Sequence, residues 1–191
     1  MADASFRILG IPGSLRRHSF NRGLLVAARE AAPPGVEIAI ADLGAIPLYH
    51  GDVEVEGLPP AVRDLKVQIR GADAVLIATP EYNYSFPGVL KNAIDWVSRP
   101  PQENVLRAKA AALMGAGGRF GTARAQLALR QVLVFTETYV LPKPELYVPH
   151  AHESFDAEGR LTDPQVREQL ASLITALVRW TRAVSEFGRG R

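Results

Sequence analysis

Apolar runs of strand length alternate along the chain with longer segments in which apolar residues recur at helical spacing. The runs at 36–40, 74–78 and 110–116 are short and almost wholly apolar, which is typical of parallel strands covered by helices on both faces. Two longer runs are also predicted as strands, and four helical segments lie between the strands. The longer strands are at 6–11 and 139–148, and the helices at 20–32, 60–70, 88–98 and 124–135.

The last helical pattern is the clearest. Pro164 lies in its first turn, and Thr162 or Asp163 precedes it as the cap. One stripe then collects apolar residues at steps of three and four, and its members are Val166, Leu170, Leu173, Ile174, Leu177 and Val178. We expect a long amphipathic helix that covers one face of a sheet.

Strand–helix alternation of this kind predicts an α/β fold with right-handed crossovers. Five strands favour a flavodoxin-like three-layer sandwich, in which a five-stranded parallel sheet in the order 2-1-3-4-5 carries helices on both faces. No linker, repeat or low-complexity segment interrupts the pattern. We therefore expect one domain over residues 1–191, with a frayed tail at 187–191.

Ligands of such sheets bind at the carboxyl ends of the strands, near the point where the strand order reverses. The loops at 10–20, 79–87 and 115–124 are therefore the candidate site. The first combines glycines, short polar side chains and arginines at the start of a helix, namely Gly10, Gly13, Ser14, Arg16, Arg17, Ser19 and Asn21. This combination indicates a phosphate cradle. It is neither a Walker loop nor a G-x-G-x-x-G fingerprint, and the alternative is an ordinary turn capped by Ser19 or Asn21.

The second loop reads T-P-E-Y-N-Y-S-F-P-G. Its two prolines predict an extended, rigid segment whose backbone N–H groups at 81–84 are free to meet a planar ring. Tyr82 and Tyr84 offer flat surfaces for such a ring, although packing in the core is the alternative. On the helix that follows, Trp96 lies away from the apolar stripe, which indicates a subunit contact.

Composition and charge remove several classes of function. The chain has 191 residues and no cysteine, which excludes disulfides, a thiolate nucleophile and Cys-based metal sites. Its charge is only +2, and the pI of 9.1 reflects 18 arginines against 4 lysines. No basic run exceeds Arg16-Arg17, so we expect no nucleic-acid partner. Without a signal peptide or an apolar stretch of ~18 residues, we expect a cytoplasmic protein with no membrane partner.

Three stretches carry a resemblance to a known family. Residues 80–100, P-E-Y-N-Y-S-F-P-G-V-L-K-N-A-I-D-W-V-S-R-P, resemble the signature of the NADPH-dependent FMN reductases. Residues 13–22 are similar to the FMN-phosphate loop of that family, and residues 123–133 resemble its helix after the fourth strand. The resemblance extends from about Arg7 to Asp163. The family includes bacterial quinone, chromate and azo-dye reductases with a flavodoxin-like fold.

The resemblance implies an FMN site. It assigns the phosphate to Ser14, Arg16, Ser19 and Asn21, and the ring to the backbone of Pro80, Glu81, Tyr82, Asn83, Tyr84 and Ser85. At Gly115–Arg119 the chain has G-A-G-G-R where the family has a Ser-Thr-Gly-like stretch. The side-chain hydroxyls are absent there, so only backbone contacts from Gly117 and Gly118 are expected.

The resemblance also implies a reaction. NADPH or NADH would reduce the flavin, which would then reduce a quinone, an azo compound, a metal oxyanion such as chromate, or free flavin, by a ping-pong mechanism. No side chain needs to act as acid or base, and Arg119 is a candidate for the NADPH phosphate, with a solvated surface arginine as the alternative. A homodimer or homotetramer is implied as well, to which Trp96 and the 88–99 helix would contribute.

Other interpretations stay open. A flavodoxin-type electron carrier would bind FMN without NAD(P)H turnover, and an FMN-free scaffold would only bind a partner. The G-A-G-G-R-F-G loop resembles a dinucleotide fingerprint but lacks an acidic residue at the right spacing. The pair His150 and His152 lacks a third ligand in sequence, so a solvated loop is favoured over a metal site.

Overall fold

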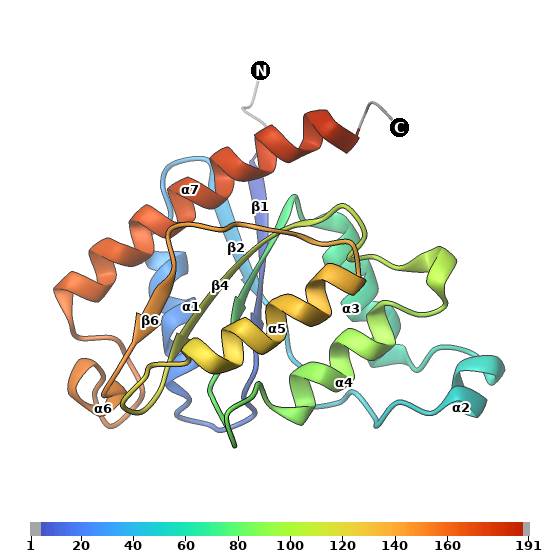
Figure 1. Cartoon of the computed structure of the whole chain (residues 1–191), viewed down its shortest axis with the longest axis horizontal. Helices are drawn as coiled ribbons and strands as arrows, with labels where there is room; N and C mark the ends of the chain where they lie inside the picture. The colour runs from blue at the N-terminus through green and yellow to red at the C-terminus, as the bar shows by residue number, and fades with distance from the viewer. Residues whose placement is uncertain (1–4, 189–191) are drawn as a thin grey trace.

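A parallel sheet runs through the centre of the molecule. The computed structural model describes residues 5–188, and Figure 1 shows helices packed along the sheet. The strand order is β2-β1-β3-β4-β5, with β6 also paired to β4, and every pairing is parallel. The strands are β1 (Phe6–Pro12), β2 (Val36–Ile40), β3 (Ala74–Ala78), β4 (Ala110–Ala116), β5 (Tyr139–Val140) and β6 (Leu146–Val148). The predicted flavodoxin-like order is confirmed.

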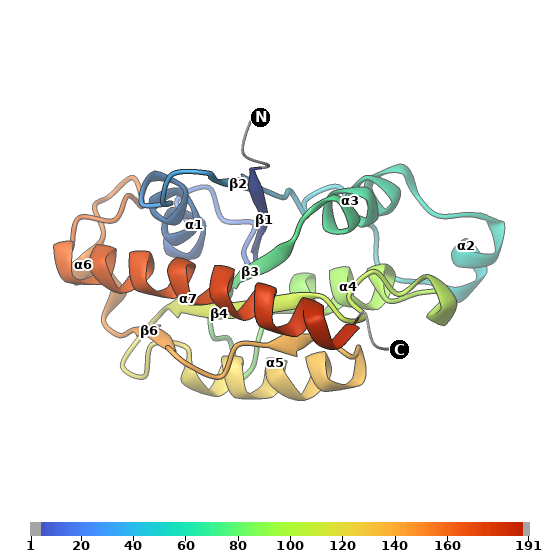
Figure 2. The same ribbon diagram turned by 90° about the horizontal axis from the view of Figure 1, so that it is seen from above.

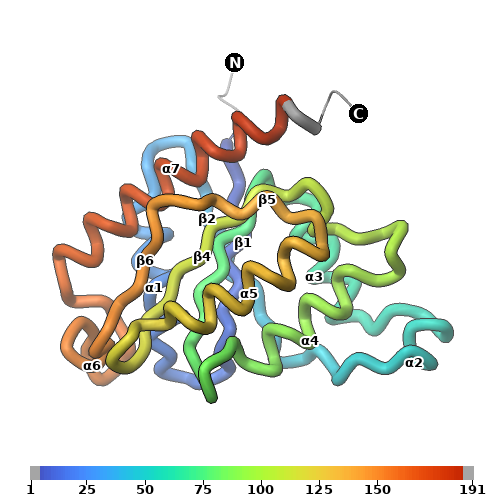
Figure 3. The backbone as a smooth tube through the Cα atoms, viewed as in Figure 1, coloured from blue at the N-terminus to red at the C-terminus, as the bar shows by residue number. Residues whose placement is uncertain are grey.

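The fifth predicted strand, 139–148, is two strands in the structure. Tyr139 of β5 pairs with Ala110 at the start of β4, and Leu146 of β6 pairs with Met114 near its end. The residues between include Pro142 and Pro144, which have no N–H group to donate to a ladder. The tube in Figure 3 shows this segment leaving β4 and returning to it. The single predicted strand is therefore wrong in its middle.

Five helices match the periodic segments. They are α1 (Phe20–Glu30), α3 (Pro60–Gly71), α4 (Gly88–Val97), α5 (Ala123–Phe135) and α7 (Pro164–Gly188). Three short helical segments were not predicted, namely α2 (Gly51–Glu56), η1 (Pro101–Glu103) and α6 (Ala151–Ser154). Of the frayed tail expected at 187–191, residues 189–191 lie outside the described residues, and the backbone of 187–188 continues α7. None of the helices over residues 5–188 is long and apolar enough to cross a bilayer.

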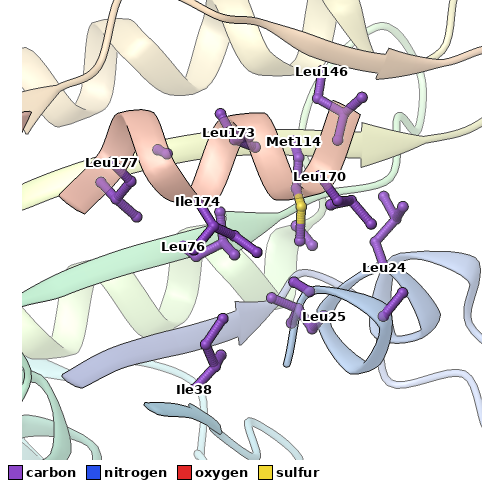
Figure 4. Close-up of a cluster of buried hydrophobic side chains, with 14 of the residues drawn as sticks. Leu24, Leu25, Ile38, Leu76, Met114, Leu146, Leu170, Leu173, Ile174 and Leu177 are labelled. Carbon is purple, nitrogen blue, oxygen red and sulfur yellow. The ribbon is translucent and has the colours of Figure 1, made fainter. Parts of the chain in front are cut away.

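Alternation along the strands builds two cores. Successive side chains of a strand point to opposite faces, so Leu76 of β3 belongs to one cluster and Ile77 to the other. The first cluster joins the sheet to α1 and α7, and Figure 4 shows Leu170, Ile174 and neighbouring α7 residues lying over it. The second joins it to α3, α4 and α5. Figure 2 shows these helices on either side of the strands, so the three-layer sandwich is confirmed.

Trp96 corrects the sequence interpretation. Its side chain is fully buried, its Nε1–H donates to the carbonyl oxygen of Pro47 at 2.9 Å, and its ring lies edge-on to Tyr49. The long connection after β2 therefore folds back and covers it. The prediction that Trp96 forms a subunit contact is wrong, because the segment that buries it has no periodicity that a sequence pattern reveals.

Candidate functional site

A cleft of about 320 Å³ lies where the loops after β1, β3 and β4 meet. This is the carboxyl edge of the sheet, where ligands of such folds bind. Of the residues expected to bind the cofactor, all but Asn83, Tyr84 and Ser85 line the cleft. The lining residues are Ser14, Arg16, Ser19, Phe20, Asn21, Pro80, Glu81, Tyr82, Ala116, Gly117, Gly118, Ala151 and His152. The structure thus brings the three predicted loops together.

One end of the cleft is the N-terminus of α1. Ser19 is the N-cap, and its hydroxyl accepts the N–H of Arg22 at 3.3 Å, so the capped-turn interpretation is confirmed. The N–H groups of Phe20 and Asn21 have no protein acceptor among residues 5–188. Free N–H groups and the positive end of the helix dipole favour an anion at this position. The Ser19 cap and free N–H donors therefore coexist at this helix end.

Side chains around this helix end are already ordered. The Ser14 hydroxyl accepts the backbone N–H of Arg16 at 3.3 Å, and Nη2 of Arg16 donates to the carbonyl oxygen of His18 at 2.8 Å. The Arg16 guanidinium also lies 5.1 Å from the centre of the Phe20 ring. Arg17, in contrast, does not line the cleft. The two adjacent arginines thus differ in position: Arg16 lines the cleft with the start of α1, and Arg17 does not.

Asn21 has a structural contact that the sequence did not suggest. Its buried amide donates through Nδ2 to the carbonyl oxygen of Ala116 and accepts the N–H of Ala116 through Oδ1, both at 2.9 Å. The side chain therefore ties the first turn of α1 to the end of β4. Because both ends of the amide are engaged, the backbone N–H of Asn21 is its better group for an anion.

The second loop forms a tight turn. The N–H of Tyr82 donates to the carbonyl oxygen of Ser85 at 2.9 Å, and the reverse bond is 3.0 Å. Asn83 and Tyr84 have φ of 50° and 67°, as in a type I′ turn. The prediction of an extended loop with all N–H groups at 81–84 free is therefore corrected, since Tyr82 uses its own. Those of Glu81, Asn83 and Tyr84 have no acceptor among the described residues.

The tyrosines of this turn lie outside the core. Tyr82 is 52% exposed and Tyr84 is 71% exposed, so the core-packing alternative for them is wrong. Tyr82 lines the cleft. Its ring is an apolar surface beside free N–H donors, which is the combination that a planar heteroaromatic ligand needs.

The carboxylate of Glu81 accepts hydrogen bonds from the start of α5. Its Oε1 accepts Nε of Arg124 at 2.5 Å, and its Oε2 accepts the backbone N–H groups of Arg124 and Ala125 at 3.1 and 3.3 Å. The carboxylate thus caps the start of α5, although Thr122 stands at the cap position. Its side chain is 8% exposed. Glu81 therefore offers the cleft its backbone N–H and not a free carboxylate.

The third loop is tied to the chain after β6. Gly117 donates its N–H to Val148, and its carbonyl accepts the N–H of Ala151. The carbonyl of Gly118 accepts the N–H groups of Gly121 and His150. Gly118 and Gly121 form an isolated antiparallel bridge, but the Gly118 N–H makes no hydrogen bond of good geometry among residues 5–188, and a Cβ at Gly118 would meet nothing within 4 Å. Of the two glycines, only Gly118 thus has a free N–H for a ligand.

The same hydrogen bonds bring α6 to the cleft, which the sequence did not predict. Ala151 and the exposed His152 line it, together with Phe20 and Ala116. The strand predicted at 139–148 already ends at Val148, as β6 does, and this end places the next residues at the carboxyl edge, so the signal was present in the sequence. His150 is exposed, and within the described residues no three His, Cys, Asp or Glu side chains form a possible metal site.

Comparisons with known proteins agree with this geometry. The model of the family "NADPH-dependent FMN reductase" matches residues 6–153. An NAD(P)H-dependent FMN reductase of Pseudomonas aeruginosa is 54% identical over 92% of this chain and 95% of that protein. An NAD(P)H:quinone oxidoreductase of Solanum tuberosum is 44% identical over 92% and 93%. The solved structure of the flavoenzyme NAD(P)H:acceptor oxidoreductase FerB from Paracoccus denitrificans has a TM-score of 0.84 at 35% identity, covering 93% and 98%.

Proposed function

The chain belongs to the NADPH-dependent FMN reductase family, and on this premise we propose that its cleft binds FMN and passes electrons from NADPH or NADH to a quinone. One observation carries the proposal. A helix N-terminus with free N–H groups and the free backbone N–H of Glu81, immediately before the turn, line the same cleft, and they match the charged and the planar ends of FMN. Relatives named as FMN and quinone reductases support the enzyme class.

The phosphate end is formed by α1 and the loop before it. Ser14 and Ser19 offer hydroxyl groups, and Arg16 retains guanidinium N–H groups beyond the one used on His18. The backbone N–H groups of Phe20 and Asn21 complete the donor set. Charge-assisted bonds of this kind are the strongest that a phosphate makes with a protein.

The ring end is formed by backbone groups. Glu81 retains a free N–H group on one side of the cleft and Gly118 retains one on the other, and those of Asn83 and Tyr84 are free in the turn next to the cleft lining. Bound FMN would supply the hydride-accepting and electron-donating chemistry that the cysteine-free chain lacks. The residues themselves fix the ring and stabilise negative charge on it with preorganised dipoles. No described side chain of the cleft is proposed as acid or base.

The finer features of the reaction belong to the same proposal. An open ring face used first by the nicotinamide and then by the acceptor gives ping-pong kinetics. Azo compounds, metal oxyanions such as chromate and free flavin are proposed as further acceptors, because an open face discriminates little. Arg119 is exposed beside the cleft loop and is proposed to meet the 2′-phosphate of NADPH.

A homodimer is also proposed, with α5 in place of Trp96 as the expected subunit interface. Leu127, Val134 and Phe135 of this helix are 57%, 75% and 88% exposed, and exposed apolar side chains in a group mark an interaction surface. Sedimentation should give more than the 20.7 kDa of one chain, and a monomer at all concentrations would contradict the proposal. A cytoplasmic location stays a prediction, to be checked by cell fractionation.

The experiment is an absorbance spectrum of the purified protein, followed by titration with NADPH and NADH without oxygen. A flavin spectrum bleached by either nucleotide and restored by a quinone is the expected result. A bound flavin that neither nucleotide bleaches would favour the flavodoxin-type carrier. A colourless protein that takes up no added FMN would favour the scaffold without cofactor.

A further inference from the structure

The turn at Tyr82–Ser85 holds two non-glycine residues at positive φ. Asn83, at 50°, belongs to a residue type that tolerates this region, whereas an aromatic residue such as Tyr84, at 67°, rarely adopts it. Such conformations persist where surrounding contacts over-determine them, and they gather at ligand clamps. The two hydrogen bonds of the turn fix Tyr82 and Ser85, so contacts from elsewhere must hold the side chain of Tyr84.

Arg124 supplies these contacts from the start of α5. Its guanidinium carbon lies 3.8 Å from the centre of the Tyr84 ring and 4.6 Å from that of Phe120. The same guanidinium donates through Nε to Glu81 at 2.5 Å, and its Nη2 pairs with the same carboxylate oxygen. Arg124 therefore contacts the loop at two points. It pairs with Glu81, immediately before the turn, and stacks on Tyr84, within the turn.

The ion pair between Arg124 and Glu81 is held in place because the Glu81 carboxylate has further partners. Its second oxygen accepts the backbone N–H groups of Arg124 and Ala125, and its side chain is nearly buried. Stacking of a guanidinium on an aromatic face adds to the ion pair. The Glu81 carboxylate also balances the charge of Arg124, so the guanidinium is suited to hold the turn and not to attract an anion.

We propose that Arg124 is a positioning residue which, through Glu81 and Tyr84, holds the turn so that its free N–H groups meet the flavin ring. The inference rests on the proposed function, since it takes the ring to lie against this turn. Donors held in place stabilise charge that develops on a ligand better than donors that must reorganise. Arg124 therefore raises the stability of the reduced cofactor without touching it.

The test compares Arg124→Gln and Glu81→Gln with Arg130→Gln as control. Arg130 lies six residues further along α5, donates to the carbonyl oxygen of Leu141 and does not line the cleft. Two readouts are the midpoint potential of bound FMN and the hydrogen exchange of amides 81–85 in the FMN-free protein. In the first two variants, exchange of these amides should accelerate, and the potential should fall by about 30 mV, a tenfold change for a two-electron couple.

Charge alone predicts a different pattern. Removing the carboxylate in Glu81→Gln would raise the potential, whereas loss of positioning lowers it in both variants. Opposite shifts, or unchanged exchange of amides 81–85, would overturn the inference while leaving FMN binding and the proposed function intact. A wild-type protein that binds no FMN would overturn the proposed function, and the inference with it.

Discussion

The two ends of the cleft are built in different ways. The phosphate end depends largely on neighbours in sequence, since Ser19 caps its own helix and Ser14 accepts the N–H of Arg16, two residues further on. The ring end depends on a partner far along the chain, since Arg124 and Glu81 are 43 residues apart. A helix N-terminus binds anions by its own geometry, whereas a strained turn needs tertiary contacts to hold it. Substitutions at the phosphate end and at the ring end should therefore differ in their effects on stability and on FMN binding.

The largest effect is expected at Gly115, under the ring end. A Cβ there would overlap Thr122 Oγ1 and the carbonyl oxygen of Thr79, and a backbone atom cannot move aside cheaply. Gly115→Ala should lower the free energy of unfolding by about 3 kcal/mol, the upper range for overpacking, as measured by urea denaturation. Gly118→Ala is the control, because its Cβ would meet open space, and it should change stability by about 0.5 kcal/mol or less. Equal effects of the two would contradict the packing interpretation.

Asn21 tests the one non-local contact of the phosphate end. Asn21→Ala leaves the buried N–H and carbonyl of Ala116 without partners, which should cost about 2–3 kcal/mol of unfolding free energy. Asn21→Asp keeps the acceptor and loses the donor, so we expect a smaller loss. Unchanged stability of the FMN-free protein together with lost FMN affinity would instead make the side chain a phosphate ligand.

Arg16 tests the local part of the same end. Arg16→Ala should weaken FMN binding by about 10- to 100-fold, the equivalent of one charge-assisted hydrogen bond, and leave unfolding of the FMN-free protein unchanged because the side chain is exposed. Fluorescence titration with FMN measures the first and thermal melting the second. Arg17→Ala, next to it but outside the cleft lining, should bind FMN as the wild type does. Equal loss in both variants would indicate a general charge effect.

The features that the sequence predicted and those that it missed follow the same division, between local patterns and contacts of distant segments. The strands at 36–40, 74–78 and 110–116 end where predicted. In the last two every residue is buried, so the apolar run specifies its own boundaries, whereas in β2, at the edge of the sheet, only Ile38 is buried and the expected cover on both faces is wrong. Sequence also placed the three loops at one edge, since parallel strands bring their carboxyl ends together. It missed the burial of Trp96 and the pairing of Glu81 with Arg124, because each contact joins a helix to a loop that is distant in the chain and without periodicity.

The smallest effect is expected at Arg119, which belongs to neither end. It is exposed, and among residues 5–188 it makes a contact with the Phe120 ring but no ion pair. An exposed arginine gains about 0.2–1 kcal/mol from a phosphate partner, so Arg119→Ala should lower the preference for NADPH over NADH by about 1.4- to fivefold. Steady-state kcat/KM for both nucleotides measures this ratio, with Arg107→Ala as an exposed arginine elsewhere. A ratio equal to that of the wild type would assign Arg119 to the solvated surface and leave nucleotide selection to the remainder of the cleft.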